Sequence, residues 1–505
     1  MVTGPVAPSD IGAGHVESPP LPPLVDNAAA YLDTDFGPVT ISLTAPDQQA
    51  LVDVEAGTTS AQAPIVFDAS DSTGSGNGTI ELHGSTSRAA IQKSFQIKLA
   101  TDAPPWRGTR TINLLKHPFD LSRVRNALSF ESFRSISSFT SLRTGFVHLT
   151  INSVDRGLYE WVEEPDKAFL TSHGLDPLGT LYKAKLFSFL PIDAATAADP
   201  TKVAGLVSSK GTPDLPKLRR MIAAVNDLTQ PINDVIGHYF NRDNYITWLA
   251  VNMLMADFDS GSQNFILYSP SGFEGWYFLP WDYDGAWGWN DQPGSAARPR
   301  WRQGLSNWWW IILHQRFLSD PANLADLDAR IGSLVASTLT PERTPALMAR
   351  YHDLVQSFIS MEPDLDNLPC DQGGTPEAIP LWQAEYTRIA GNVSGTDAEY
   401  AGTLGRPMPF WLYSPAFGAQ GVTLSWSPSF QLRGQPLSYD LEINGAESYD
   451  PASAVATEAG LLEPLFTTGA LPPGHYFWRV VARSASDPAS DWQMAFNDHA
   501  TVDIP

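Results

Sequence analysis

Four oxygen-bearing side chains in two short motifs stand out in the middle of the chain. Asp259 and Asn264 are five positions apart, and Asp282 and Asp284 follow after two short apolar runs. Mg²⁺ in phosphoryl-transfer sites takes one or two carboxylates and an amide oxygen as ligands. A carboxylate can also accept the proton of an attacking hydroxyl while an amide five positions later holds a metal. The spacing therefore indicates phosphoryl transfer, with a later aspartate, Asp282 or Asp284, holding the metal that bridges the phosphates.

Other interpretations use the same residues. A calcium loop beginning at Asp257 is excluded, because its sixth position is Ser262 where glycine is required and its twelfth is Tyr268 where glutamate is required. Aspartates at helix ends and in turns are often structural, and Asp257 in particular fits that interpretation. An oxygen-rich site also supports attack by water, so a metal-dependent hydrolase stays open as a further interpretation.

The segments around these residues are predicted to position them at one end of a sheet. A helix over 243–256 leads toward Asp259, and two strands at 265–268 and 276–279 frame a turn at 270–275. Such a hairpin brings Asn264 and Asp282 to the same end. Further helices are predicted at 214–226, 232–239, 322–336, 342–361 and 375–392.

The pattern of the N-terminal part predicts β-strands. Alternating apolar residues predict strands at 40–44, 80–83 and 93–99, with a flexible glycine turn at 74–78. A helix at 122–138 and paired strands at 145–151 and 157–162 follow. Strands followed by helices predict an α+β fold with the cleft between the two parts.

The C-terminal region has a different pattern. Alternating strands at 422–426, 437–443 and 475–482, separated by Gly and Pro turns, predict an all-β immunoglobulin-like sandwich. The region resembles a fibronectin type III module in Trp426 and in the run 471–474 before Tyr476. Such modules position or bind, so we assign no chemistry to it. The predicted organisation is a Pro-rich disordered tail or linker at 1–37, a domain at 38–400 that is β-rich to about 210 and helical after it, a linker at 401–409 and a β-sandwich at 410–505.

Composition limits the partners. The formal charge of −23 argues against broad affinity for nucleic acid or anionic membranes, because phosphates are held by clustered Lys and Arg. A basic protein substrate would be favoured by this acidic field, although solubility alone also accounts for the charge. No run approaches the roughly 18 apolar residues of a membrane span. A single cysteine, Cys370, excludes an intrachain disulfide.

The first residues lack the basic and apolar regions of a secretory signal, so we expect a cytoplasmic protein. A leader absent from this chain, export by another route, or incorporation into a larger assembly stays open. The run 19–23 is a candidate docking peptide for a protein partner, with plain disorder as the alternative.

Four blocks resemble the CotH (spore coat protein H) kinase family, in the family's order and over roughly residues 38 to 290. They are His83-Gly-Ser-Thr-Ser-Arg88 with Lys93-Ser-Phe95; Gly157-Leu-Tyr-Glu-Trp-Val-Glu163 with Asp166-Lys167; Leu181-Tyr-Lys183; and residues 259–264 followed by Pro280-Trp-Asp-Tyr-Asp284. The resemblance implies an atypical, two-lobed protein-kinase-like domain that transfers the γ-phosphate of ATP to a protein serine or threonine, with Mg²⁺ or Mn²⁺.

The resemblance also implies roles for individual residues. Asp259 would be the catalytic carboxylate, with Asn264, Asp282 and Asp284 as metal ligands. The loop 84–88 would cover the phosphates, Lys93 would contact phosphate and pair with Glu163, and Trp276 would stack on adenine. The residues implied to bind nucleotide are Gly84, Ser85, Ser87, Arg88, Lys93, Glu163, Lys183 and Trp276.

One position departs from the family pattern. The first arginine of the phosphate-loop motif is His83 here, and a neutral histidine cannot make a bidentate phosphate contact. The alternative function is therefore a catalytically weak or inactive structural or adhesive component, binding partners through its tail and sandwich.

Overall fold

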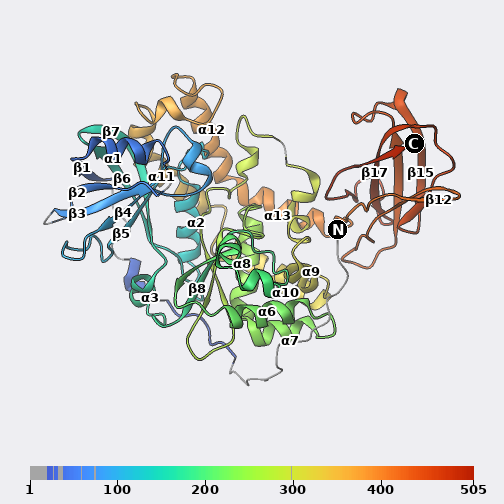
Figure 1. Ribbon diagram of the computed structural model, residues 1–505, viewed down its shortest axis with the longest axis horizontal. Coiled ribbons are helices and arrows are strands. Elements are labelled where there is room, and N and C mark those ends of the chain that lie inside the picture. The colour runs from blue at the N-terminus through green and yellow to red at the C-terminus, as the bar shows by residue number, and fades with distance from the viewer. Residues whose placement is uncertain (1–19, 27, 32–37, 59, 73–74, 297) are drawn as a thin grey trace.

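The computed structural model describes residues 20–26, 28–31, 38–58, 60–72, 75–296 and 298–505 (Figure 1). Three separate hydrophobic cores organise these residues: one inside an N-terminal barrel, one in the helical middle of the chain, and one between two C-terminal sheets. The α+β class expected from the sequence is confirmed. Among the described residues, no helix has the length and apolar character needed to cross a bilayer.

The N-terminal barrel is closed, with strand order β1-β2-β3-β4-β5-β7-β6. β2 alternates buried and exposed residues throughout its length, so one of its faces fills the barrel, whereas consecutive residues of β5 and β7 are buried on both faces. The strands are β1 (Val39–Thr44), β2 (Ala63–Ala69), β3 (Gly76–Leu82), β4 (Phe95–Leu99), β5 (Thr111–Leu115), β6 (Thr144–Ile151) and β7 (Val154–Glu163), and α1 (Gln48–Glu55) packs against β2 and β3. The turn between β6 and β7 has positive φ at Asn152 and Ser153, the conformation that tight hairpins require.

The glycine turn expected at 74–78 is only partly a turn, because Gly76 and Gly78 belong to β3. A Cβ on Gly78 would lie 2.6 Å from the carbonyl oxygen of Lys98 on β4, and one on Gly76 would lie 2.8 Å from Cβ of Ala103. These glycines therefore allow close approach of neighbouring chains rather than a reversal of direction.

A second, four-stranded antiparallel sheet has the order β11-β10-β8-β9. Its strands are β8 (Thr180–Ala184), β9 (Val207–Gly211), β10 (Phe265–Ser269) and β11 (Tyr277–Pro280). The sequence placed the change from the β-rich to the helical part near residue 210, but β8 and β9 pair within the sheet that contains β10. β8 and β9 therefore belong to the second sheet and not to the N-terminal barrel.

Helices surround this second sheet and also return to the barrel. Figure 1 shows α11 and α12 beside the barrel strands, and α11 contacts β7. The helices are α2 (Arg125–Arg134), α3 (Lys167–Ser172), α4 (Ala194–Ala197), α5 (Pro200–Leu206), α6 (Leu215–Asn226), α7 (Ile232–Tyr239), α8 (Arg242–Leu254), α9 (Ile312–Leu318), α10 (Pro321–Ser337), α11 (Arg343–Ile359), α12 (Ala378–Ala390) and α13 (Asn392–Thr403). Short 3₁₀ turns occur at Ala28–Tyr31, Thr86–Ala89, Trp289–Asp291, Arg300–Arg302, Gly304–Trp308, Leu365–Asn367 and Pro451–Ser453.

The C-terminal region consists of two antiparallel sheets that enclose the third core. One has the order β12-β13-β16, and the other β15-β14-β17-β18 with β19 paired to β17. These strands are β12 (Ala416–Gly418), β13 (Gly421–Ser425), β14 (Leu437–Asn444), β15 (Ala454–Leu461), β16 (Leu465–Thr467), β17 (Gly474–Ser484), β18 (Trp492–Met494) and β19 (Ala500–Ile504). The start of the linker expected at 401–409 is helical, because α13 continues to Thr403.

The N-terminal strap, defined as residues 20–26 and 28–31, packs on the rest of the protein. Leu24 is buried in the middle core, and the carbonyl of Pro22 accepts hydrogen bonds from Tyr277 Oη (2.6 Å) and Asn241 Nδ2 (2.9 Å). The disordered tail predicted at 1–37 is therefore wrong for these residues, because apolar burial and hydrogen bonds offset the entropy of ordering. Residues 1–19, 27 and 32–37 of that segment, including Pro19 of the docking peptide, lie outside the described residues.

Candidate active site

The β10–β11 hairpin brings Asn264 and Asp282 together. Phe265 pairs with Pro280, so the residues just before β10 and just after β11 share one end of the hairpin. Both Asn264 (φ 59°) and Asp282 (φ 62°) have left-handed backbone conformations, which Asn and Asp tolerate better than other non-glycine residues. Strained backbone of this kind concentrates at functional sites.

Asp259 lies in the loop after α8, which ends at Leu254, and not in the helix itself. Asp257 is buried and shapes this loop by accepting hydrogen bonds from the backbone N–H of Asp259 (3.0 Å) and from Ser260 Oγ (2.5 Å). Burial raises the pKa of Asp257 to about 7. Its contacts give Asp257 a structural role, whereas Asp259 is partly exposed.

The side chain of Asp259 lies beside both later motifs. Its carboxylate accepts hydrogen bonds from Gln263 Nε2 (2.7 Å) and Asn264 Nδ2 (2.8 Å). A Cβ placed on Gly285 would lie 3.4 Å from Cβ of Asp259, so Asp259 packs against the residue that follows Asp284. The loop and the hairpin therefore bring Asp259, Asn264, Asp282 and Asp284 into one group.

Asp282 and Asp284 alternate with the fully buried Tyr283, so both carboxylates remain partly exposed. Burial and the negative charge of Asp284 raise the pKa of Asp282 to about 6, although the cation of Lys183 acts in the opposite direction. Burial and the charge of Asp284 also raise the pKa of Asp259. Crowded carboxylates of this kind are stabilised by a cation.

Lys183 is the lysine that the structure places with the carboxylates. Lys183 lies on β8 and pairs with Ile266 of β10, and Ile266 is two residues after Asn264. The Nζ of Lys183 is 3.8 Å from the centroid of the Trp281 ring. Burial lowers the pKa of Lys183 to about 8, against the opposing charges of Asp282 and Glu164. The contact with nucleotide expected of Lys183 stays a prediction.

A divalent cation fits the chemistry of the carboxylate group. Asn264 turns its NH₂ toward Asp259, which leaves its amide oxygen available as a ligand beside the partly buried Asp282 and Asp284. Within the described part of the chain, no three or more His, Cys, Asp and Glu side chains form a group that could hold a metal ion, so the carboxylates alone do not make a preformed metal site. Two carboxylates and an amide leave coordination positions that water and substrate oxygens would fill.

Two residues that the sequence did not point to are Glu164, at the end of a barrel strand, and Lys210, in the second sheet. Glu164 follows β7 and pairs with Lys210 Nζ on β9 (2.5 Å), and its other oxygen accepts from Asn113 Nδ2 (2.8 Å). The charges of Glu164 and Lys210 both act on Lys183 and on His83. Glu164 directly follows Glu163 of the sequence motif, which could have drawn attention to Glu164. No pattern in the sequence around Lys210 indicated a role for Lys210.

Glu163 faces the opposite side of β7 and does not pair with Lys93. It pairs with Arg143 (2.6 Å) and His173 (3.0 Å), because adjacent residues of a strand point in opposite directions. Lys93 instead donates a hydrogen bond to the carbonyl of Arg88 (2.5 Å). The ion pair expected between them is therefore not formed, and Glu164 with Lys210 is the pair that links the barrel to the second sheet.

The loop 84–88 connects β3 to the segment before β4. Gly84 has φ 83°, and a Cβ there would lie 2.3 Å from Ser87 Oγ, so glycine is required. Ser85 is exposed, and Arg88 donates to the carbonyls of Gly84 (2.8 Å) and Leu82 (3.0 Å) within its own loop. The loop thus holds its own shape through Arg88.

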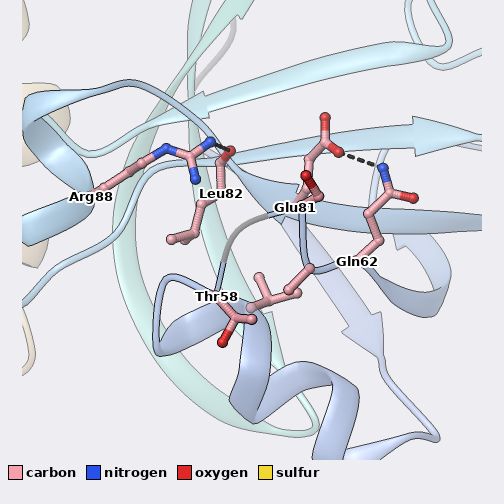
Figure 2. A pocket seen from close by; sticks show the side chains of 8 residues that line it. Thr58, Gln62, Glu81, Leu82 and Arg88 are labelled. Carbon is pink, nitrogen blue, oxygen red and sulfur yellow. Dashed lines mark hydrogen bonds between the residues drawn. The ribbon is translucent and has the colours of Figure 1, made fainter.

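Arg88 also lines a cavity of about 430 Å³ at the side of the barrel. Figure 2 shows Arg88 with Thr58, Gln62, Glu81 and Leu82, and Gln62 Nε2 donates to Glu81 (2.5 Å). None of the four aspartate and asparagine side chains of the candidate site lines this cavity.

Trp276 does not lie with the candidate site. It is fully buried, bridges to Phe240, and comes just before Tyr277, which pairs with Tyr268 at the end of the hairpin away from Asn264. Its ring contacts Tyr182 and the Lys217 cation. A buried ring offers no free face, so the stacking role expected of Trp276 is not supported.

Two comparisons bear on this arrangement. A protein-family model described as CotH kinase protein matches residues 80–390, more than half of the chain. The chain is also 26% identical over 295 residues to the inner spore coat protein H of Bacillus subtilis (strain 168), which covers 56% of this chain and 78% of that protein.

Proposed function

Because the chain belongs to the CotH kinase protein family, we propose that it transfers the γ-phosphate of ATP to a serine or threonine of a protein. The observation that carries the proposal is the convergence of Asp259, Asn264, Asp282 and Asp284 at one end of the β10–β11 hairpin, beside Lys183. In this proposal the barrel and the helical part with its second sheet are the two lobes of an atypical kinase, and the C-terminal sheets form a fibronectin type III-like sandwich.

Each residue of the group has a proposed role. Asp259 accepts the proton of the attacking hydroxyl while the O–P bond to the γ-phosphorus forms and the bond to the β-phosphate oxygen breaks. Asn264, Asp282 and Asp284 would hold Mg²⁺ or Mn²⁺, which supplies neutralisation of phosphate charge when bound. Lys183 carries a positive charge toward the same phosphates, and the loop 84–88 closes over them.

Labelling with γ-labelled ATP tests this mechanism. Wild-type protein is incubated with a basic protein substrate, beside Asp259→Ala, Asp282→Ala and the exposed control Asp353→Ala. We expect labelling by wild type and by the control, and a loss of at least about 100-fold in the two site variants. Equal labelling by all four proteins would contradict the mechanism, and free phosphate without labelled protein would indicate the hydrolase.

A second function is favoured by His83. Burial and the nearby charge of Lys183 lower the pKa of His83 to about 4, so the position that carries arginine in the family is uncharged at neutral pH. The relative named as an inner spore coat protein is compatible with a structural role inside a larger assembly. A chain that does not bind nucleotide with Mn²⁺, measured as no rise in melting temperature, would favour this function.

A further inference from the structure

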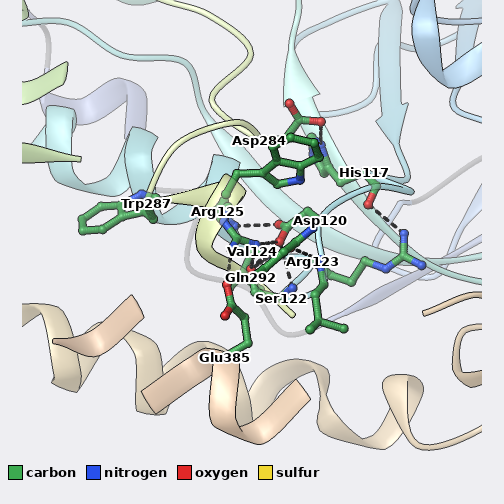
Figure 3. Close-up of polar contacts among 12 residues, drawn as sticks. His117, Asp120, Ser122, Arg123, Val124, Arg125, Asp284, Trp287, Gln292 and Glu385 are labelled. Atoms are coloured by element: carbon green, nitrogen blue, oxygen red, sulfur yellow. Dashed lines mark hydrogen bonds and ion pairs between the residues drawn. The ribbon is translucent and has the colours of Figure 1, made fainter. Parts of the chain in front are cut away.

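His117 lies between two carboxylates, one of which belongs to the candidate site. Its Nδ1 is 3.1 Å from Asp284 Oδ2, and its Nε2 is 2.8 Å from Glu160 Oε2. The imidazole is only 3% exposed, whereas the Asp284 side chain is 34% exposed. Figure 3 shows the His117 ring pointing directly at the Asp284 carboxylate. A buried side chain therefore holds one oxygen of a carboxylate whose other oxygen is left for a ligand.

The loop that carries His117 is held in place by buried cations. Arg123 donates from Nη1 to the carbonyls of His117 (2.8 Å) and Lys116 (2.9 Å), and Figure 3 shows the contact between Arg123 and His117. Arg125 pairs with Asp120 and Glu385 in the same cluster. His117 has φ 48°, a left-handed conformation that persists only where surrounding contacts enforce it. The position of the ring is thus set by the fold and not by its own rotamer alone.

Glu160, the second carboxylate partner of His117, is also connected to the candidate site through Asn126. Glu160 on β7 accepts from Asn126 Nδ2 (3.0 Å), and Asn126 on α2 accepts from the backbone N–H of Tyr283 (2.8 Å). Asp284 is therefore held through His117, and the residue before it through Asn126. Both routes meet at Glu160, so the barrel strand β7 determines where this carboxylate lies.

We propose that His117 is a positioning residue that orients Asp284 as a metal ligand and couples the placement of that ligand to the barrel. The inference rests on the proposed function, since Asp284 is a ligand only in a metal–nucleotide site. Partners of this kind orient ligating side chains, and their loss lowers metal affinity by about 10–100-fold. Both ring nitrogens lie within hydrogen-bond distance of a carboxylate, so the ring bridges Asp284 and Glu160.

Two substitutions separate the two contacts. His117→Asn keeps an NH₂ near the position of Nδ1 and tolerates the left-handed backbone, whereas His117→Gln reaches toward Glu160 in place of Nε2. The matched control is His173→Gln, since His173 is equally buried between two carboxylates, those of Asp26 (2.8 Å) and Glu163 (3.0 Å).

The measurement is the apparent dissociation constant of Mn²⁺ in the presence of a non-hydrolysable ATP analogue, from the electron paramagnetic resonance signal of free Mn²⁺. We expect His117→Gln to weaken Mn²⁺ binding by about 10-fold or more, His117→Asn by clearly less, and His173→Gln to leave it unchanged. Glu160→Gln, which keeps the shape of the network, is expected to give a smaller loss than His117→Gln and serves where that variant does not fold.

The outcomes distinguish the inference from the proposed function. Wild type that takes up no Mn²⁺ with the nucleotide overturns both. Wild-type uptake that His117→Gln and Glu160→Gln leave unaltered overturns the inference alone. An equal loss in His117→Asn, His117→Gln and His173→Gln also overturns it, because that pattern would report general destabilisation.

Discussion

At the scale of single residues, the candidate site concentrates negative charge that the fold must tolerate. Asp259 accepts two amide hydrogen bonds, yet burial and the charge of Asp284 still raise its pKa. A carboxylate with a raised pKa is held in its ionised form at a cost to stability above its ordinary pKa. Residues selected for chemistry commonly carry such a cost.

Asp259→Asn should therefore lose activity without losing stability. The amide keeps one acceptor, and Gln263 can turn its own oxygen toward the new NH₂ group. We expect phosphate transfer to fall by roughly 100- to 10,000-fold and the melting temperature at neutral pH to stay equal or rise. Steady-state kinetics and thermal unfolding of the same preparation measure both; a variant that is inactive and also melts lower would contradict the charge argument.

At the scale of elements, the N-terminal strap stabilises the middle core of the protein. Leu24 is 4% exposed in the middle core, whereas its neighbour Val25 is 74% exposed. Leu24→Ala is expected to lower the free energy of unfolding by about 2–4 kcal/mol because it leaves a cavity. Val25→Ala, the matched control one residue away, should change it by less than about 0.5 kcal/mol in the same urea titration. Equal small effects would mean that the strap contributes no packing.

The strap also makes stability depend on pH through His173. Burial alone would lower the pKa of His173, but hydrogen bonds from its ring to Asp26 and Glu163 raise it above 6.5. This stabilisation is complete below pH 6.5 and is lost as the pH rises through the raised pKa. The pKa of Glu163 is shifted in the opposite direction, downward, so the stabilisation that Glu163 provides is lost as the pH falls.

His173→Gln tests the direction of this dependence. The loss of stability in the variant, relative to wild type, should be largest near pH 6 and shrink toward pH 9. Urea unfolding of both proteins at about pH 6, 7.5 and 9 measures the difference, in which contributions from unrelated groups cancel. A difference that grows with pH would show that the histidine is neutral in the fold.

At the scale of the whole molecule, the C-terminal sheets are docked on the helical part and not simply tethered to it. The rings of Trp309 and Phe430 stack with centroids 5.3 Å apart, and Trp309 is 5% exposed. Arg300 lies 4.1 Å from the centroid of Trp492 and donates to its carbonyl (2.8 Å). Gln493 is fully buried and donates to Ser306 Oγ (3.1 Å).

This interface should make the two regions unfold together. Trp309→Ala removes the stacked ring and is expected to cost about 3–5 kcal/mol, which separates the unfolding of the sandwich from that of the rest. Differential scanning calorimetry should then show two transitions in place of one. Phe417→Ala, on the exposed face of β12, is the control and should leave a single transition. One transition in both variants would mean that the regions are coupled elsewhere.

The sequence by itself determined many of the elements and the spacing on which the candidate site depends. The periodic spacing of apolar residues predicted the following elements closely: β1, β4, β10, β11, α6, α7 and α8. This succeeds because an element that buries one face has apolar residues at regular positions in its sequence. The spacing of Asp259, Asn264, Asp282 and Asp284 predicted their convergence, because one loop and one hairpin separate them.

Only the tertiary structure decided which residues from other elements meet this group. Glu164 rather than Glu163 pairs with the second sheet because strand alternation reverses the direction of adjacent side chains. His117, Glu160 and Lys210 lie far from the motif in sequence, and Trp276 is buried on the far end of the hairpin. Contacts between distant segments depend on how sheets and helices pack, and no local pattern records that packing.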